Sequence, residues 1–194
     1  MILSPDQQSQ LLDLARDSIR SALRVARGPA VPDDPEFRQP AGVFVTLHQR
    51  GTHRLRGCIG RLDARAPLGE TVATMARAVL EDPRFVEDPV TAEELVELDI
   101  ELSVLSPLQP TAGPTSFDLH GDGIYLTCGG RAGCFLPQVA RETGWNKEQL
   151  LDRLCTEKMG LPADAWRYAN ASLYRFTALE IGPEPFVKEE NTAR

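Results

Sequence analysis

Cys58 is the residue with the clearest chemical potential, because it is the only strong nucleophile in a glycine-rich hexapeptide, residues 55–60 (LRGCIG). Flanking glycines let a ligand approach the backbone closely and leave amides free to bind an anion. On a regular strand, residues 54, 56 and 58 share one face, which places two arginines beside the thiol. Guanidinium charge lowers a thiol pKa and raises the thiolate fraction. The pattern predicts a nucleophilic Cys58 and an anion site with the candidate ligands Arg54, Arg56, Gly57 and Gly60.

A structural interpretation of Cys58 accounts for the same pattern. Free cysteine is among the most buried residue types and behaves as a small hydrophobic residue. A small buried side chain between glycines would let two elements pack closely. The two interpretations predict different exposure of the thiol, and the sequence leaves both open.

The nearby histidines are poorly placed to activate Cys58. His53 is five positions away, on the opposite face of a regular strand, and His48 would pair with His53 across the turn. Two histidines without a third ligand make a weak metal site. A glycine-containing loop carries three further polar residues whose spacing fits no EF-hand, namely Asp118, His120 and Asp122. We interpret these residues as ordinary hairpin and loop groups, and expect no metal and no cofactor.

Five arginines gather around the hexapeptide of an otherwise acidic chain: Arg50, Arg54, Arg56, Arg61 and Arg65. Arginine matches phosphate oxygens with two parallel hydrogen bonds, so the cluster could hold a small phosphate-bearing ligand. A charged hairpin edge that discourages aggregation would show the same composition. The sequence is compatible with both a phosphate site and a charged hairpin edge.

Composition narrows the class of partner. The chain has 194 residues, a formal net charge of −7 and a pI of about 5.0. Proteins that bind duplex DNA present a strongly basic face, so we expect no duplex DNA partner. No segment approaches the roughly 20 apolar residues of a membrane helix, and the N-terminus lacks a signal peptide, so we expect no membrane association and a cytoplasmic protein.

The four cysteines are expected to be free thiols, because a chain in a reducing compartment rarely forms disulfides. None of them has the C-x-x-C spacing of a structural zinc site. Cys128 and Cys134 flank an expected five-residue turn and would approach one another across two strands. Cys155 falls on the inner side of an expected amphipathic helix and is assigned to the core.

The elements that must position the hexapeptide follow from local patterns. Ser4, Pro5 and Gln7 begin a helix with a capping box, and Arg27-Gly28-Pro29 ends it. Residues 43–48 and 53–59 predict a β-hairpin, residues 67–80 a helix that stops at Asp82-Pro83, and residues 98–104 an alternating strand. Between this helix and this strand, Thr91 and Glu94 predict a second capping box at the start of a short helix.

A second set of elements repeats this order. Residues 124–128 and 134–136 predict a hairpin around a glycine turn, followed by helices from Pro137 and from Asn146 to Met159, and by a last strand at 172–181. We therefore expect an α+β fold with an N-terminal helix and two similar strand-helix halves, about 40–105 and 115–181. These halves would share one mostly antiparallel, partly barrel-like sheet. A single domain would span 1–185, with a polar tail at 186–194.

The hexapeptide resembles the L-R-G-C-I-G signature of the AMMECR-type domain family, also called system protein A of the AmmeMemoRadiSam set. Three further blocks resemble the family in the same order: residues 44–47 (FVTL), residues 129–139 (GGRAGCFLPQV), and a third block around Trp145, Cys155 and Trp166. The resemblance covers nearly the whole chain. It implies an α+β fold with two similar repeats and partners that are Memo-like or radical-SAM proteins. It implies no settled reaction.

Two functions from different classes remain. The hexapeptide could form a catalytic or binding site for a small anionic ligand, in a pathway shared with Memo-like and radical-SAM proteins. Alternatively, the chain could be an interaction module that adapts such partners without doing chemistry. An open, ligand-sized cleft with an exposed Cys58 would favour the first, and a buried Cys58 beside an apolar surface would favour the second.

Overall fold

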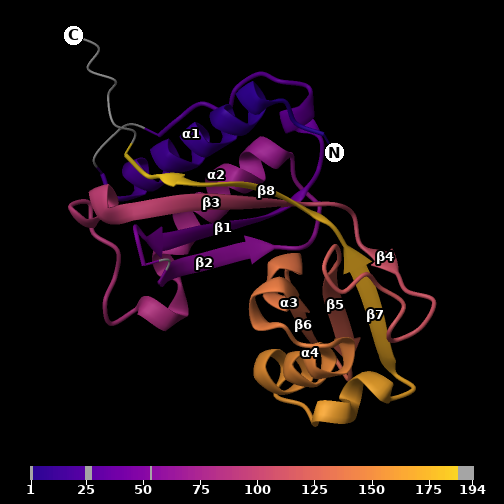
Figure 1. Ribbon diagram of the computed structural model, residues 1–194. Helices are drawn as coiled ribbons and strands as arrows, with labels where there is room; N and C mark the ends of the chain where they lie inside the picture. Colours follow the sequence, from indigo (N-terminus) through magenta and orange to yellow (C-terminus); the bar gives the residue numbers. More distant parts are fainter. Residues whose placement is uncertain (1, 25–27, 53, 188–194) are drawn as a thin grey trace. The chain divides into compact units, whose positions relative to one another are not determined.

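The structure, a computed structural model, describes residues 2–24, 28–52 and 54–187. The chain divides into two compact units. Unit 1 comprises Met1–Val104 and Leu179–Arg194, and unit 2 comprises Leu105–Ala178. Each unit contains one four-stranded sheet and its own hydrophobic core (Figure 1).

Unit 1 has the strand order β2-β1-β3-β8, accompanied by two α-helices and several short 3₁₀ turns. Its helices and strands are α1 (Pro5–Ala22), β1 (Gly42–Gln49), β2 (Leu55–Arg61), α2 (Leu68–Ala78), β3 (Leu98–Leu105) and β8 (Ala178–Pro185). Its 3₁₀ turns are η1 (Glu36–Arg38), η2 (Val79–Glu81), η3 (Pro83–Phe85) and η4 (Glu94–Glu97).

The core of unit 1 forms where two helices meet one face of the sheet (Figure 1). The predicted capping box at Ser4 and Gln7 is present at the start of α1, and one side of the helix is buried. Alternate residues of β1 and β3 are fully buried, including Val43, Val45 and Ile100. This alternation leaves Thr46 and its neighbours two residues away on the other face of the sheet. Part of the helix end predicted at residues 27–29 lies outside the described residues.

The β1–β2 hairpin contains an irregularity inside the hexapeptide. Leu47 pairs with Gly57, whereas His48 pairs with Leu55, so Arg56 is an extra residue in β2. Such a β-bulge interrupts the strict alternation of faces and redirects a side chain. The expectation that residues 54, 56 and 58 share one face therefore fails at Arg56.

Unit 2 has the strand order β4-β7-β5-β6, with two short helices packed on one face. Its helices and strands are β4 (Gln109–Pro110), β5 (Gly123–Cys128), β6 (Arg131–Phe135), α3 (Pro137–Thr143), α4 (Lys147–Arg153) and β7 (Ala171–Phe176). A π-helical turn (Leu154–Lys158) continues α4, and a 3₁₀ turn (Ala163–Arg167) precedes β7. The predicted cap at Asn146 is present, with Gln149 completing a capping box.

The β5–β6 hairpin has a shorter turn than predicted. Cys128 pairs with Arg131, so the connection consists only of Gly129 and Gly130, both with positive φ. Two glycines with positive φ suit the two-residue hairpin turns whose twist matches the flanking strands. Cys134 consequently pairs with Tyr125 and not with Cys128. The predicted approach of the two cysteines across the strands is wrong.

The α+β class, the antiparallel pairing and the N-terminal helix are confirmed, but the strands form two sheets where one shared sheet was expected. The predicted last strand is in fact two strands, β7 and β8, separated at Thr177 and assigned to different sheets. Phe186 is fully buried, so packing extends into the expected polar tail. Within the described residues, no helix combines the length and apolarity needed to cross a membrane.

Candidate functional site

Cys58 lies on β2 in a polar network that joins three segments of unit 1. Its backbone N–H donates to Asp82 Oδ2 at 2.8 Å, and its carbonyl accepts from Arg84 Nη2 at 3.1 Å. The Thr46 hydroxyl, directly opposite on β1, lies 3.4 Å from Cys58 Sγ. The network therefore binds the backbone of the hexapeptide to the turn that follows α2.

The environment of the Cys58 thiol favours its neutral form. Cys58 is half-buried, and removal of its thiol from water raises the pKa of the thiol above its ordinary value. The negative charges of Asp82 and Glu101 add to the effect. The Thr46 hydrogen bond and the positive charge of Arg84 oppose the increase without reversing it. The nearby guanidinium belongs to Arg84 and not to Arg54 or Arg56. The expected lowering of the thiol pKa by those two arginines is therefore wrong.

Asp82 organises this network from a side chain that is only 2% exposed. Its carboxylate accepts hydrogen bonds from the Cys58 amide, the Arg84 amide at 3.0 Å and the Arg84 guanidinium at 2.6 Å. Burial alone would raise the Asp82 pKa, but the hydrogen bonds from Arg84 and Cys58 outweigh it and lower the pKa to about 2. Asp82 is therefore ionised at neutral pH and keeps Arg84 beside the hexapeptide.

Arg56 is committed to internal contacts. The guanidinium donates to both carboxylate oxygens of Glu94, with the Nη2 to Oε2 distance at 3.0 Å, and lies 5.4 Å from the centroid of the Phe85 ring. Its side chain is 4% exposed, and Asp88 Oδ1 lies 3.6 Å from Nη2. A buried arginine that two carboxylates already neutralise offers little to an external anion. It instead attaches the hexapeptide to the segment between α2 and β3.

The two glycines are required by packing. A Cβ on Gly57 would lie 3.1 Å from the side chain and the carbonyl oxygen of Val79. A Cβ on Gly60 would lie 2.3 Å from the Phe44 ring and 2.6 Å from the Val43 carbonyl oxygen. The space that suggested a ligand beside each glycine is therefore filled by protein atoms.

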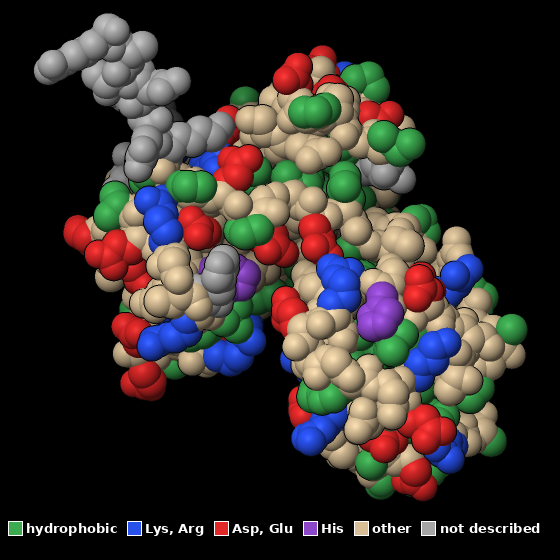
Figure 2. Space-filling view, in the orientation of Figure 1, with side chains coloured by type: hydrophobic (Ala, Val, Ile, Leu, Met, Phe, Trp, Pro, Cys, Tyr) green, Lys and Arg blue, Asp and Glu red, His purple; other side chains and the backbone are tan. Residues whose placement is uncertain are grey.

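The arginine cluster is largely neutralised by acidic neighbours. Arg50 pairs with Asp99 at 3.3 Å, while Arg61 and Arg65 lie 2.9 and 3.0 Å from the carboxylate of Asp63. Arg54 precedes β2 and is exposed. Acidic and basic side chains are interspersed on the face of the molecule that Figure 2 shows. The cluster thus resembles a charged hairpin edge more than a ready-made phosphate site.

The remaining candidate residues are distributed over both units. His48 pairs with Leu55, and His53 lies outside the described residues. All four cysteines are free thiols, and Cys128 and Cys155 are buried in the core of unit 2. Burial raises the Cys155 pKa. These contacts support the assignment of Cys155 to the core.

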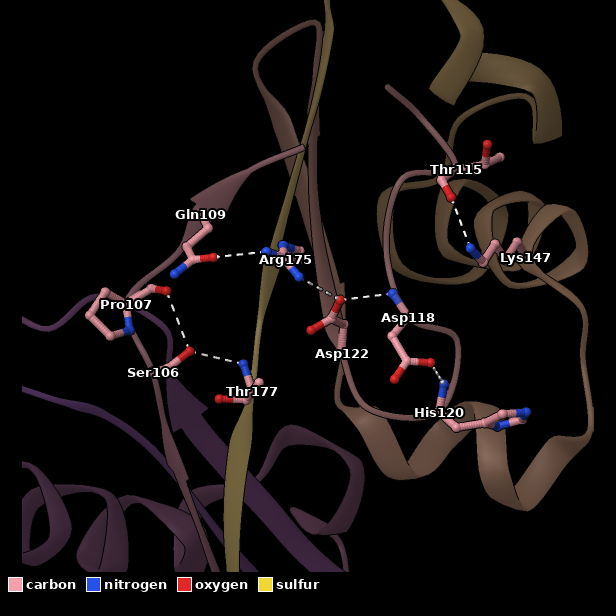
Figure 3. Close-up of polar contacts among 10 residues, drawn as sticks. All are labelled: Ser106, Pro107, Gln109, Thr115, Asp118, His120, Asp122, Lys147, Arg175 and Thr177. Atoms are coloured by element: carbon pink, nitrogen blue, oxygen red, sulfur yellow. Dashed lines mark hydrogen bonds and ion pairs between the residues drawn. The ribbon is translucent and has the colours of Figure 1, made fainter. Parts of the chain in front are cut away.

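The loop with Asp118, His120 and Asp122 is held by its own hydrogen bonds (Figure 3). Asp122 Oδ2 accepts from the Asp118 amide at 2.8 Å and lies 3.4 Å from Arg175 Nη1. Asp118 Oδ1 accepts from the His120 amide at 3.2 Å. Across the described residues, no group of three histidine, cysteine or acidic side chains is arranged to hold a metal ion.

Three cavities lie away from the hexapeptide. One of about 420 Å³ lies in unit 1 and is lined by the hairpin end at 49–52 together with Val96 and Glu97. Another of about 590 Å³ lies between the ends of α1 and α2, and a third of about 350 Å³ lies in unit 2 beside β7. None of these three is lined by Cys58 or its hexapeptide neighbours.

Known proteins match this chain almost from end to end. The AMMECR1 family matches residues 12–181. A protein from Methanothermobacter thermautotrophicus is 40% identical over 185 residues, covering 91% of this chain and 94% of the relative. A protein from Thermococcus gammatolerans is 41% identical over 187 residues, covering 91% and 89%. The chain belongs to the AMMECR1 family.

A solved structure supports the same assignment at the level of the fold. The crystal structure of an uncharacterized protein from Pyrococcus horikoshii has a TM-score of 0.80 and is 36% identical, with 88% of each chain covered. The match to the AMMECR1 family includes the hexapeptide and all strands of unit 2.

Three residues of the network around Cys58 were not predicted from the sequence: Thr46, Asp82 and Arg84. Asp82 was interpreted only as the end of a helix before Pro83, although an Asp-Pro-Arg tripeptide also offers a carboxylate that caps the next turn. Thr46 lies opposite Cys58 only in the observed register, in which His48 pairs with Leu55. The predicted pairing of His48 with His53 is wrong, and it would have placed Leu55 opposite Thr46. Arg84 pairs locally with Asp82, but its contact with the Cys58 carbonyl, 26 residues away, had no local signal.

Proposed function

We propose that this AMMECR1-type chain is a non-catalytic interaction module, and that its hexapeptide holds the segment between α2 and β3 (residues 79–97) in a shape that a protein partner recognises. One observation supports this most directly. The polar and small groups of the hexapeptide contact that segment: Arg56 pairs with Glu94, Gly57 packs on Val79, and the Cys58 amide binds Asp82. Such contacts build a surface and leave few groups for chemistry.

The segment 79–97 carries apolar side chains that a partner could cover. Val86 is 68% exposed and Val96 is 55% exposed, both on a segment held in place by buried contacts. Val96 also lines the 420 Å³ cavity with the hairpin end. Apolar side chains that are exposed on a segment already held in place can be covered by a partner with little ordering cost.

The AMMECR-type resemblance implies Memo-like and radical-SAM proteins as partners. We propose that proteins of these two kinds bind segment 79–97. The four free thiols suit a reducing compartment, so we place this association in the cytoplasm.

The test is a binding measurement between the full chain and a purified Memo-like or radical-SAM protein from the same organism. We expect Val86→Asp and Val96→Asp to weaken binding at least about tenfold, since a charge at an apolar interface must be desolvated. Ile2→Asp is the matched control, because Ile2 is an exposed apolar residue, 92% exposed, outside the segment. Absence of binding to both partners, or equal binding by all three variants, would refute the proposal.

A small-ligand or catalytic site at the hexapeptide is the second candidate, with Cys58 as nucleophile and Arg54, Arg56, Gly57 and Gly60 as ligand-binding residues. One observation favours it: the Arg84 guanidinium, whose side chain is 51% exposed, lies beside the Cys58 carbonyl. Sulfate or phosphate would then raise the melting temperature in a saturable way by binding the folded state. The rise would be lost in Arg84→Gln and retained in Arg65→Gln, whose arginine is 84% exposed. A rise common to all salts and both variants would remove this candidate.

A further inference from the structure

Unit 2 contains a cavity of about 350 Å³ beside β7. It shares no residue with segment 79–97 of unit 1, the proposed partner surface. Three stretches line it: the end of β4 and the residues after it (Pro110, Thr111, Gly113 and Pro114), Trp166–Tyr168, and Ala171–Tyr174. Small-ligand sites have volumes of roughly 300–1,000 Å³, so this cavity is large enough for a compact ligand. All of its walls belong to unit 2.

The aromatic wall of the cavity is held in a fixed orientation. Trp166 is 6% exposed, and its indole N–H donates to Asp152 Oδ1 at 2.7 Å. The Arg167 guanidinium lies 4.1 Å from the centroid of the Trp166 ring, a stacking distance for these two planar groups. Trp166 is therefore a buried support on which the Arg167 guanidinium rests. The next residue, Tyr168, is 44% exposed and provides the flat surface that another ring can cover.

The charge of the lining is positive. Arg167 is the only charged residue among the described residues that line the cavity, in a chain with a net charge of −7. Its ion pair with Glu148 spans 3.4 Å, and the two side chains are 54% and 66% exposed. An ion pair so exposed to water holds its partners weakly. The guanidinium can therefore exchange Glu148 for the anionic group of a ligand.

We propose that this cavity binds a small planar aromatic compound that carries one carboxylate or phosphate group. The ring stacks on the exposed Tyr168, and the anionic group accepts hydrogen bonds from Arg167, whose guanidinium rests on the buried Trp166. Aromatic faces bind any planar ring, whereas the guanidinium fork selects a carboxylate or phosphate. A nucleotide and an aromatic carboxylate share this chemistry, and the experiment distinguishes them.

The experiment is calorimetric titration of the full chain, at low ionic strength, with AMP and with indole-3-carboxylate. We expect at least one of them to bind with a dissociation constant below about 1 mM, a range within reach of a few hydrogen bonds and one stacked ring. Three control compounds should bind at least about tenfold more weakly. Adenosine and indole lack the anionic group, and phosphate lacks the ring. Preference for AMP or for the carboxylate identifies the source of the ligand.

Matched variants decide whether the cavity is responsible. Arg167→Gln and Tyr168→Ala should each weaken binding about tenfold, whereas Tyr168→Phe, which keeps the ring, should not. Arg153→Gln is the control, because Arg153 is 57% exposed, stacks on Trp145 and pairs with Glu157 on another surface of unit 2. Binding of neither compound, or equal loss in Arg167→Gln and Arg153→Gln, would overturn the proposal. The partner experiment concerns unit 1, so the two proposals can fail separately.

Discussion

The side chains around Cys58 keep its thiol neutral and give most polar groups of the hexapeptide an internal partner. A reactive cysteine needs a partly exposed, electropositive setting, in which thiolate is stabilised relative to thiol. Here burial raises the thiol pKa, and the carboxylate of Asp82 largely neutralises the adjacent Arg84. The side chains and amides of the hexapeptide therefore connect β2 to the segment between α2 and β3.

Loss of the Arg56–Glu94 pair should destabilise the fold strongly. Removing Glu94 leaves Arg56, which is 4% exposed, with only the 3.6 Å contact to Asp88, and removing Arg56 leaves Glu94, which is 19% exposed, without its cation. Breaking a buried ion pair costs roughly 3–5 kcal/mol, and the partial exposure of Glu94 places this pair toward the lower end. We expect this loss for Arg56→Ala and for Glu94→Ala in urea unfolding, and the double variant should lose less than the sum. Arg54→Ala, at an exposed position two residues away, should change the unfolding free energy by less than about 0.5 kcal/mol. Equal effects of Arg54→Ala and Arg56→Ala would contradict the assignment.

Asp82 should make stability depend on pH in the acid range. Its pKa is about 2 in the folded chain against an ordinary 3.8, so folding favours the ionised form. The contribution, on the order of 2 kcal/mol, is therefore complete above about pH 4 and is lost as the pH falls toward 2. Asp82→Asn should be less stable than the parent at pH 7, and the difference should shrink between pH 4 and 2. The same difference at all pH values would show that Asp82 acts without its charge. Glu87→Gln, at an exposed acidic position of the same segment, is the control.

The residue types of the hexapeptide indicated that its structure is constrained. They did not indicate which residues of the same chain its side chains and amides contact. The close packing that the glycines serve was visible in residues 55–60, whereas Cys58 itself is half-buried and matches neither the exposed nor the fully buried interpretation. The contacts of Arg56 and the Cys58 amide depend on residues 38 and 24 positions away in sequence. Local spacing carries no information about such contacts, and the bulge at Arg56 invalidated the face assignment on which the anion-site prediction depended.

At the scale of elements, the β1–β2 hairpin depends on close approach at Gly60. A Cβ there would meet the Phe44 ring and the backbone oxygen of Val43, and backbone cannot move aside as a side chain can. We expect Gly60→Ala to lower the unfolding free energy by roughly 1–3 kcal/mol, the cost of overpacking. Gly57→Ala, with contacts of 3.1 Å, should cost less. Gly113→Ala, whose nearest contact would be Ser116 Oγ at 3.4 Å, is the control, and an equal cost at all three positions would contradict the packing account.

Elements with strong local signals were predicted well, and their partners were not. The capping box at Ser4 and the helix start at Asn146 are present where the sequence placed them. Strand β3 is also present, but the predicted alternation holds only for its first half, because residues 102–105 are all buried. The alternation across residues 172–181 did not reveal that β7 and β8 pair with strands of different sheets. Alternation specifies which side of a strand is buried, whereas the choice of neighbouring strand depends on residues far along the chain.

At the scale of the whole chain, each unit has its own core and should respond separately to damage. Leu126 and Leu102 are fully buried in units 2 and 1 respectively, and replacing either with alanine should cost about 2–5 kcal/mol. In hydrogen exchange, Leu126→Ala should lower amide protection mainly in residues 105–178, and Leu102→Ala mainly in the remainder, as expected for separate cooperative units. Uniform loss of protection in both variants would show that the units unfold as one.

The reactivity of Cys58 in the folded chain tests the structural role of the hexapeptide most directly. Native protein is treated with iodoacetamide over a range of pH, and the modified fraction of each cysteine is measured by peptide mass spectrometry. Because burial raises the Cys58 pKa, we expect slow alkylation whose rate rises only above the ordinary thiol value of about 8.5, and fast alkylation after unfolding. Rapid alkylation of native Cys58 at pH 7, with a midpoint below that value, would contradict the structural account and favour a nucleophilic site.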